Sequence, residues 1–342
     1  MERLNNIGLK GLQRIGNYLG TDMVYVAKSG FWLTLGQVFA SILAFGLSIF
    51  FANYVPKEIY GQYKFVLSAT GILGALSLTG MGTVVIQAVA RGSEGILKDA
   101  VRTTLRCGTI ILLVGLGTSI YYFWNGNTVL GFSMLIASIC LPLSNAFGLY
   151  GGYFSGKKNF KMSTIYWIVS QTLITLGLIT VSLLTQNVLA LVIVYFLIGV
   201  ITALWSYRHV LSKYKPNNVK DDSMMTYGKH VSLMNFFGTI ANQLDKILVF
   251  HYLGAVNLAI YAFSQAIPEQ IKGSYKNLFA IALPKYAVLN EKDLRRSIMK
   301  KTAQLTLISV AIVLTYILFA PLVFKLFFPQ YVEAVIYSQL YM

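Results

Sequence analysis

Long runs of apolar residues, separated by short polar segments, dominate the pattern of this 342-residue chain. A helix needs about 20 mainly apolar residues to cross the ~30 Å hydrocarbon core of a bilayer. Several runs meet this length and contain no Asp, Glu, Lys or Arg: residues 29–56, 65–90, 107–156, 162–207 and 302–324. Two of them are long enough for two spans each, and turn-forming residues divide them at Asn125–Asn127 and Gln186–Asn187.

Two further apolar helices, within residues 231–284, are predicted to form a hairpin that carries charges inside its apolar pattern. A charged side chain at membrane depth costs at least ~2.5–3.5 kcal/mol, so such residues face a bundle interior or a wet cavity and mark functional sites. The charged residues are Asp245 and Lys246 in the first helix, and Glu269, Lys272 and Lys276 in the second. With this hairpin, the pattern predicts an all-α polytopic membrane protein of about nine full spans and a partial tenth.

Helical spacing places the polar residues of the hairpin in two rows. Steps of three or four residues lie on one helical face. The second helix has Tyr261, Gln265, Glu269, Lys272 and Lys276 at such steps, and the first has Asn235, Gly238, Asn242 and Asp245. Two rows that face each other would line a cavity, and a helix beginning near Leu258 would bring Glu269 and Lys272 close to the membrane midplane.

Composition and charge agree with this interpretation. Hydrophobic residues make up 56% of the chain and charged residues 12%, and the mean hydropathy is +0.63. The net charge of +16 arises from Lys and Arg in alternate connecting segments, which predicts that residues 1–28, 91–106, 157–161, 208–229 and 285–301 are cytoplasmic. Lys57, Lys64 and Lys325 fall in the predicted outer segments. A contiguous basic face is missing, so we expect no nucleic-acid partner.

The basic segments 91–106 and 285–301 have two-faced helical patterns. In the first, Lys98, Arg102 and Arg106 share one face, and Leu97, Val101 and Leu105 share another. This pattern predicts helices that lie at the cytoplasmic membrane surface.

The order of the spans predicts four regions: a cytoplasmic interfacial segment (1–28), a six-helix lobe (29–207), a cytoplasmic linker (208–230) and an incomplete second lobe (231–342). Tyrosines nine residues apart recur across corresponding short loops, at Tyr54 and Tyr63 and again at Tyr252 and Tyr261. Spans one and seven run in the same direction, which is typical of parallel repeats with a substrate site between the halves.

Three segments carry a resemblance to a known family: GQY at 61–63, NQLDKILVFHYLGAVNLAIYAFSQA at 242–266 and FKLFFPQYVEA at 324–334. In these segments the chain resembles the polysaccharide flippases, the O-antigen and capsule repeat-unit translocases of the multidrug/oligosaccharidyl-lipid/polysaccharide exporter superfamily. The resemblance implies a two-lobed, inverted-V helix bundle. The family usually has twelve or more spans, so the chain is expected to be C-terminally truncated. Ala259 and Ile260 depart from the family pattern, which usually has Gly before the loop tyrosine.

The resemblance implies that the protein moves an undecaprenyl-diphosphate-linked oligosaccharide from the inner to the outer leaflet of a bacterial inner membrane, by alternating access. The oligosaccharide would be a repeat unit of lipopolysaccharide O-antigen or of capsule. Lys272, Lys276 and Lys28 are then candidate ligands of the diphosphate, because it needs cations to leave water. Gln265 and Asn242 would suit the glycan. Asp245 and Glu269 are candidates for coupling transport to H⁺ or Na⁺.

Other readings remain open at this point. Asp245–Lys246 and Glu269–Lys272 are alternatively structural pairs that lower the insertion cost, and Lys276 alternatively snorkels to the inner interface. A drug/cation antiporter of the same superfamily, a membrane enzyme of polysaccharide assembly and a non-functional fragment are the alternative functions. We predict no enzyme, because the outer loops are short. No metal or cofactor is expected either, since the three histidines are scattered and no metal-ligand spacing occurs.

Overall fold

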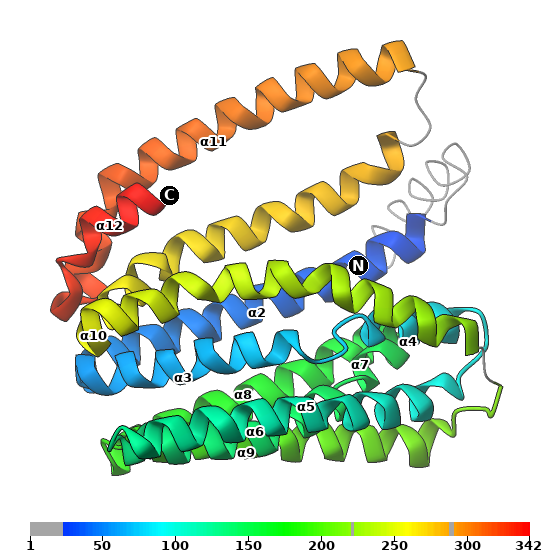
Figure 1. Ribbon diagram of the computed structural model, residues 1–342. Helices are drawn as coiled ribbons and strands as arrows, with labels where there is room; N and C mark the ends of the chain where they lie inside the picture. The colour runs from blue at the N-terminus through cyan, green and yellow to red at the C-terminus, as the bar shows by residue number, and fades with distance from the viewer. Residues whose placement is uncertain (1–22, 220–221, 287–290) are drawn as a thin grey trace. The chain divides into compact units, whose positions relative to one another are not determined.

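The computed structural model describes residues 23–219, 222–286 and 291–342, with side chains chiefly from 30–219, 226–272 and 306–342. Every regular element in these ranges is helical, which confirms the predicted all-α class (Figure 1). The helices are α2 (Met23–Tyr54), α3 (Lys57–Ala75), α4 (Met81–Ala90), α5 (Ile96–Trp124), α6 (Thr128–Phe147), α7 (Tyr150–Gly156), α8 (Phe160–Leu184), α9 (Val188–His209), α10 (Asp222–Tyr286), α11 (Glu291–Phe327) and α12 (Ala334–Tyr341), with short turns η1 (Val210–Tyr214) and η2 (Pro329–Tyr331).

Seven helical stretches of the described chain are long and apolar enough to cross a membrane, which confirms a multi-pass membrane protein. They are Gly30–Tyr54, Ile96–Trp124, Thr128–Gly156, Phe160–Leu184, Val188–Tyr214, Thr226–Lys272 and Thr306–Phe327. The sixth of these has 47 residues and contains most of the predicted charged hairpin. The predicted second span is divided between α3 and α4. Neither helix alone is long and apolar enough to cross a membrane. The count of nine full spans stays a prediction.

Gly254 produces the turn of the hairpin inside α10. Its backbone has φ 84° and ψ 178°, a conformation that is essentially restricted to glycine, whereas α10 is helical on both sides. The two helical arms therefore meet at one residue, and the second arm begins at Ala255 rather than near Leu258. At ~1.5 Å per residue, Lys272 lies roughly 25 Å along this arm. The predicted position of Glu269 and Lys272 near the membrane midplane stays a prediction.

The basic segment 91–106 differs from its prediction in one respect. It is not a separate surface helix, because α5 begins at Ile96 and runs unbroken to Trp124. Its two faces are as predicted: Leu97 and Val101 are buried, whereas Lys98, Arg102 and Arg106 are exposed. The corresponding side chains of 285–301 lie outside the described residues.

The chain divides into two compact units, residues 1–44 with 68–244 and residues 45–67 with 245–342. These units cut across α2, α3 and α10, so they do not follow the predicted boundary at 208–230. The division of the sequence into a six-helix lobe, a linker and a second lobe therefore stays a prediction.

In the first unit α5 packs along α6, α6 along α9, and α8 along α9. Small residues allow this close packing: a Cβ on Gly115 would lie 1.9 Å from the Ser138 hydroxyl, and one on Gly108 would lie 2.6 Å from Pro142. A hydrophobic cluster joins α4, α5 and α7 and is centred on Met81, Leu97 and Phe154.

Candidate functional site

The second unit joins polar residues from both arms of α10. Asp245, nine residues before Gly254, accepts hydrogen bonds from the Tyr261 hydroxyl at 2.7 Å and from the Gln265 amide at 3.3 Å. Its other oxygen accepts from the backbone N–H of Lys246 at 2.8 Å. Gln265 is almost fully buried. The structure thus brings Asp245 to the face that carries Tyr261 and Gln265, as the two-row pattern predicted.

A second polar group lies farther along the same arm. The Lys272 ammonium is 3.3 Å from the Glu269 carboxylate, and the Tyr341 hydroxyl donates to the same carboxylate oxygen at 2.6 Å. The Lys272 ammonium also lies 5.9 Å from the centre of the Tyr341 ring. Both charged side chains are about half exposed, at 49% for Glu269 and 59% for Lys272. Lys272 therefore keeps donor positions that Glu269 does not occupy.

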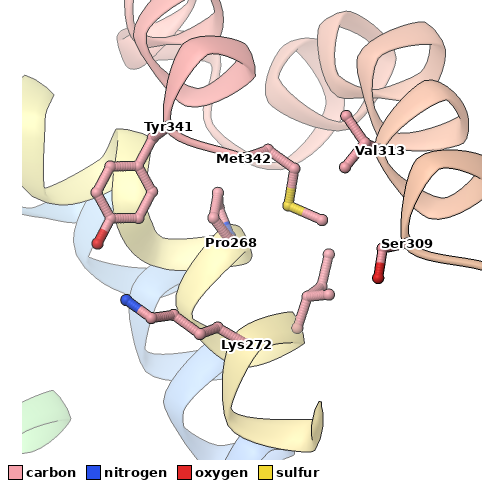
Figure 2. A pocket seen from close by; sticks show the side chains of 7 residues that line it. Pro268, Lys272, Ser309, Val313, Tyr341 and Met342 are labelled. Atoms are coloured by element: carbon pink, nitrogen blue, oxygen red, sulfur yellow. The ribbon is translucent and has the colours of Figure 1, made fainter. Parts of the chain in front are cut away.

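A cavity of about 450 Å³ lies beside this group, between α10, α11 and the end of α12. Figure 2 shows Lys272 and Tyr341 on one side and Ser309 and Val313 on the opposite side, with Met342 between them. Pro268 and Ile271 complete the lining. Among the described residues that line it, most are apolar and Lys272 is the cation at the edge, an arrangement typical of sites for amphipathic ligands.

The other predicted site residues either lie apart from this group or have side chains outside the described residues. Asn242 is exposed and belongs to the first compact unit. The side chains of Lys28 and Lys276 lie outside the described residues, so their roles stay predictions. Tyr341 was missed by the sequence analysis, because one tyrosine among 22, at 72 residues from Glu269, gives no signal of its own.

Contacts at the predicted outer side form a further cluster in the second unit. Lys57 makes an ion pair of 2.5 Å with Glu333, although the two lie 276 residues apart in sequence. The Asn53 amide donates to the Phe327 carbonyl at 3.1 Å. The Gln330 amide donates in turn to the Asn53 carbonyl at 3.3 Å. These contacts connect the end of α2 and the start of α3 to the end of α11 and the segment that follows it.

A stack of aromatic rings lies beneath these contacts. The Tyr60 ring stacks on Phe263 at 4.6 Å, and Phe263 contacts Tyr331 at 4.1 Å. Tyr331 is fully buried and its hydroxyl has no hydrogen-bond partner in the described structure. Burial raises the pKa of this hydroxyl, so it stays protonated and remains a donor.

Lys64 lies in a helix and not in a connecting segment, whereas its predicted place on the outer side stays a prediction. It was assigned to an outer connecting segment because the uncharged run begins at Phe65. The structure begins α3 at Lys57, so Lys64 lies inside the helix. Its ammonium is 5.4 Å from the centre of the Tyr60 ring. It belongs to none of the ion pairs between described side chains.

An acidic residue is also buried in the first unit. Glu94 accepts from Lys157 and, at 3.1 Å, from the Tyr153 hydroxyl. The Asn217 side chain accepts from the Glu94 N–H at 3.1 Å and donates to the Gly92 carbonyl at 2.8 Å. These bonds fix residues of the predicted linker to the turn between α4 and α5. We assign this cluster to structure, because every charge in it is paired.

No group of three or more His, Cys, Asp or Glu side chains in the described part of the chain is arranged to hold a metal ion.

Comparison with known proteins gives a family and a fold. A family model described as "Polysaccharide biosynthesis protein" matches residues 26–284. No curated protein matches the chain.

Several solved structures are similar in fold. An outward-facing multidrug resistance MATE family transporter of the MOP superfamily is similar with a TM-score of 0.60 and 14% identity over 90% of this chain and 77% of that chain. A MATE protein in complex with MaD3S gives 0.59 and 15% over the same shares. A MOP superfamily transporter from Pyrococcus furiosus gives 0.54 and 13% over 90% and 75%. At these identities the likeness shows a common fold, that of MOP transporters.

Proposed function

The chain belongs to the polysaccharide biosynthesis protein family, and we propose that it is a flippase for a lipid-linked oligosaccharide. The proposed substrate is an undecaprenyl-diphosphate-linked repeat unit of O-antigen or capsule. The proposed movement is from the inner to the outer leaflet of a bacterial inner membrane, with the N-terminus cytoplasmic. The observation that carries the proposal is the cavity of about 450 Å³ with Lys272 at its edge, within a family of polysaccharide assembly.

The chemistry of the substrate fits this cavity. A diphosphate must exchange water for cationic donors, and an ammonium is a common phosphate ligand in proteins. Lys272 is half exposed and retains free donor positions beside Glu269, while the apolar walls suit the lipid-proximal part of the substrate. We assign the same role to Lys276 and, at the cytoplasmic end of α2, to Lys28. We place Lys272 toward the predicted inner side, where the substrate would enter.

The amide side chains have different proposed roles. Asn242 is exposed, and we propose that its amide contacts the hydroxyl groups of the glycan. Gln265 reaches a glycan only if it leaves Asp245, to which it donates in this structure. Substrate binding at Gln265 would thus release one bond that holds the arms of α10 together.

Asp245 and Glu269 are the proposed coupling residues for H⁺ or Na⁺. Protonation of Asp245 removes its negative charge, which weakens the hydrogen bonds that it accepts from Tyr261 and Gln265. Because these bonds join the two arms of α10, the protonation state of Asp245 would bias their separation. The same carboxylates favour a drug/cation antiporter as the second candidate. We place it second because Lys272 stands at the cavity edge, where a cationic drug would be repelled.

Lys272 provides the decisive test, with the full-length protein expressed in a strain that lacks its flippase. Lys272→Arg should keep export of surface polysaccharide, since Arg also binds phosphate. Lys272→Gln should lose export while the protein still reaches the membrane. The double change Glu269→Gln with Lys272→Gln should stay inactive. Export by the double variant would show that Lys272 only neutralises Glu269, and the proposal would fail.

The proposed orientation has its own test. A reporter fused after Asn127 should be external, and one fused after Lys220 should be internal. The opposite result at both positions would reverse the proposed topology.

A further inference from the structure

The first three turns of α5 carry a row of exposed cations. Lys98, Arg102 and Arg106, the basic row, follow one another at steps of four residues and so share one helical face. Successive members lie roughly 6 Å apart along the helix axis. Within the described part of the chain, neither Lys98 nor Arg106 belongs to an ion pair. Arg102 has one, of 4.0 Å with Asp99, and its side chain is still 72% exposed.

The opposite face of these turns is packed into the first unit. Leu97 and Val101 are buried in the hydrophobic cluster that joins α4, α5 and α7. Thr104, one turn farther along, is 3% exposed. The packed face sets the rotation of α5 about its axis, so the cations of the basic row point away from the interior of the unit. The row is therefore a fixed feature of the surface of this unit.

The length of α5 indicates where the basic row meets a membrane. Trp124, the last residue of α5, is 89% exposed, and exposed Trp typically lies at a membrane–water interface. Arg106 precedes Trp124 by 18 residues, roughly 27 Å along the axis, which is close to the ~30 Å thickness of the hydrocarbon core. Arg106 thus lies at the opposite boundary of the core. Arg102 and Lys98 lie roughly 6 and 12 Å farther out, in and beyond a headgroup layer about 5–8 Å thick.

Helix α9 gives the same depth independently. Trp205 is 57% exposed and lies 17 residues after Val188, the first residue of α9, which again is about one core thickness, roughly 26 Å. Tyr207 follows two residues later, and Arg102 is close enough to its hydroxyl to act on it electrostatically. An interfacial tryptophan on α9 therefore lies within about one helical turn of the level of Arg102.

The headgroup layer at this depth is rich in phosphate, and anionic phospholipids give it a net negative charge. A guanidinium binds phosphate through parallel N–H···O bonds. We propose that the basic row is a binding surface for the headgroups of anionic phospholipids. Arg102 and Arg106 contact the phosphates directly, and Lys98 acts by longer-range attraction. This inference does not rest on the proposed flippase function, and none of the three residues lines the cavity at Lys272.

Native mass spectrometry of the full-length protein in an uncharged maltoside detergent tests the proposal. The protein is titrated with dioleoyl phosphatidylglycerol and, separately, with dioleoyl phosphatidylcholine, and the lipid preference is the ratio of the two dissociation constants. The wild type should prefer phosphatidylglycerol ~20-fold or more. Arg102→Gln with Arg106→Gln should lower this preference ~10-fold or more, at about fivefold for each cation, and leave phosphatidylcholine binding unchanged. Arg102→Lys with Arg106→Lys should stay within about threefold of the wild type, because the charge is retained.

A matched control separates a site from net charge. Lys213 and Lys215 are also exposed cations of the first unit, but they follow Trp205 by more than two helical turns, beyond the headgroup layer. Lys213→Gln with Lys215→Gln removes the same charge and should change the preference less than about twofold. An equal loss in this control would overturn the proposal, since total charge would then account for the preference. An unchanged preference in the Arg102→Gln, Arg106→Gln variant would overturn it as well.

Asp99 provides a test that does not remove any member of the basic row. Asp99→Asn takes away the carboxylate that pairs with Arg102, so it should strengthen phosphatidylglycerol binding ~2-fold or more and leave phosphatidylcholine binding unchanged. Weaker binding of phosphatidylglycerol by Asp99→Asn would overturn the proposal. This result stands even if the double glutamine variant fails to fold.

Discussion

Gly61, the first residue of the GQY segment, offers a sharp test of how α3 packs against α10. A Cβ at this position would lie 1.8 Å from the carbonyl oxygen of Ala255 and 2.5 Å from its carbonyl carbon. Real Cβ atoms essentially never approach other atoms within 3.0 Å. The obstacle is backbone next to the Gly254 turn, so no change of rotamer relieves the clash. Gly61→Ala therefore has to push the two helices apart by roughly 1 Å.

The size of the effect follows from the contacts on either side. Phe65 stacks on Phe250 at 3.9 Å and Tyr60 stacks on Phe263 at 4.6 Å, and both stacks join α3 to α10. Overpacking costs typically ~1–3 kcal/mol, and we expect the upper end because two aromatic stacks separate with the helices. Gly74→Ala is the matched control on the same helix, because its added Cβ meets nothing within 4 Å. Gly74 is half-buried and is the next-to-last residue of α3, so Gly74→Ala should raise the stability by less than the ~0.5–1 kcal/mol typical of helix interiors.

The assay is thermal unfolding in detergent, followed by fluorescence-detected size exclusion. At ~2 °C per kcal/mol, the value for larger domains, Gly61→Ala should lower the Tm by roughly 5 °C or more. Gly74→Ala should leave it unchanged or slightly raised. Equal Tm values for the two alanine variants would refute the close approach of α3 to Ala255.

Two ion pairs give further predictions. Lys57 and Glu333 are 29% and 52% exposed, so a double-mutant cycle with Lys57→Gln and Glu333→Gln should give a coupling of ~0.2–1 kcal/mol that falls as salt is added; zero coupling at low salt would contradict the contact. Lys157→Met should destabilise the protein by ~1–3 kcal/mol in chemical denaturation, because it leaves the buried Glu94 carboxylate without its cation. This value is below that of a fully buried ion pair because Lys157 is 43% exposed and water screens its charge. Adding Glu94→Gln should recover most of that loss, and a double variant no more stable than Lys157→Met would show that the pair is not the cause.

The sequence alone determined the class of the protein and the local pattern of its helices. In lipid every backbone polar group must bond within its own segment, so apolar runs of span length form helices whatever surrounds them. Periodicity is equally local. It placed Leu97 and Val101 opposite Lys98 and Arg102, and it put Tyr261 and Gln265 on the face that meets Asp245, as the structure has them.

Tertiary structure decided which of these faces meet and where each helix begins. Glu269 acquires Tyr341 from 72 residues away, and Lys57 acquires Glu333 from 276 residues away. Lys64 lies inside α3 because the helix starts at Lys57, before the uncharged run that marks the span in the sequence. Helices in a membrane associate through close packing of small residues and not through a hydrophobic driving force. The partner of each face therefore depends on shape at positions such as Gly61 and Gly254, which no periodic pattern records.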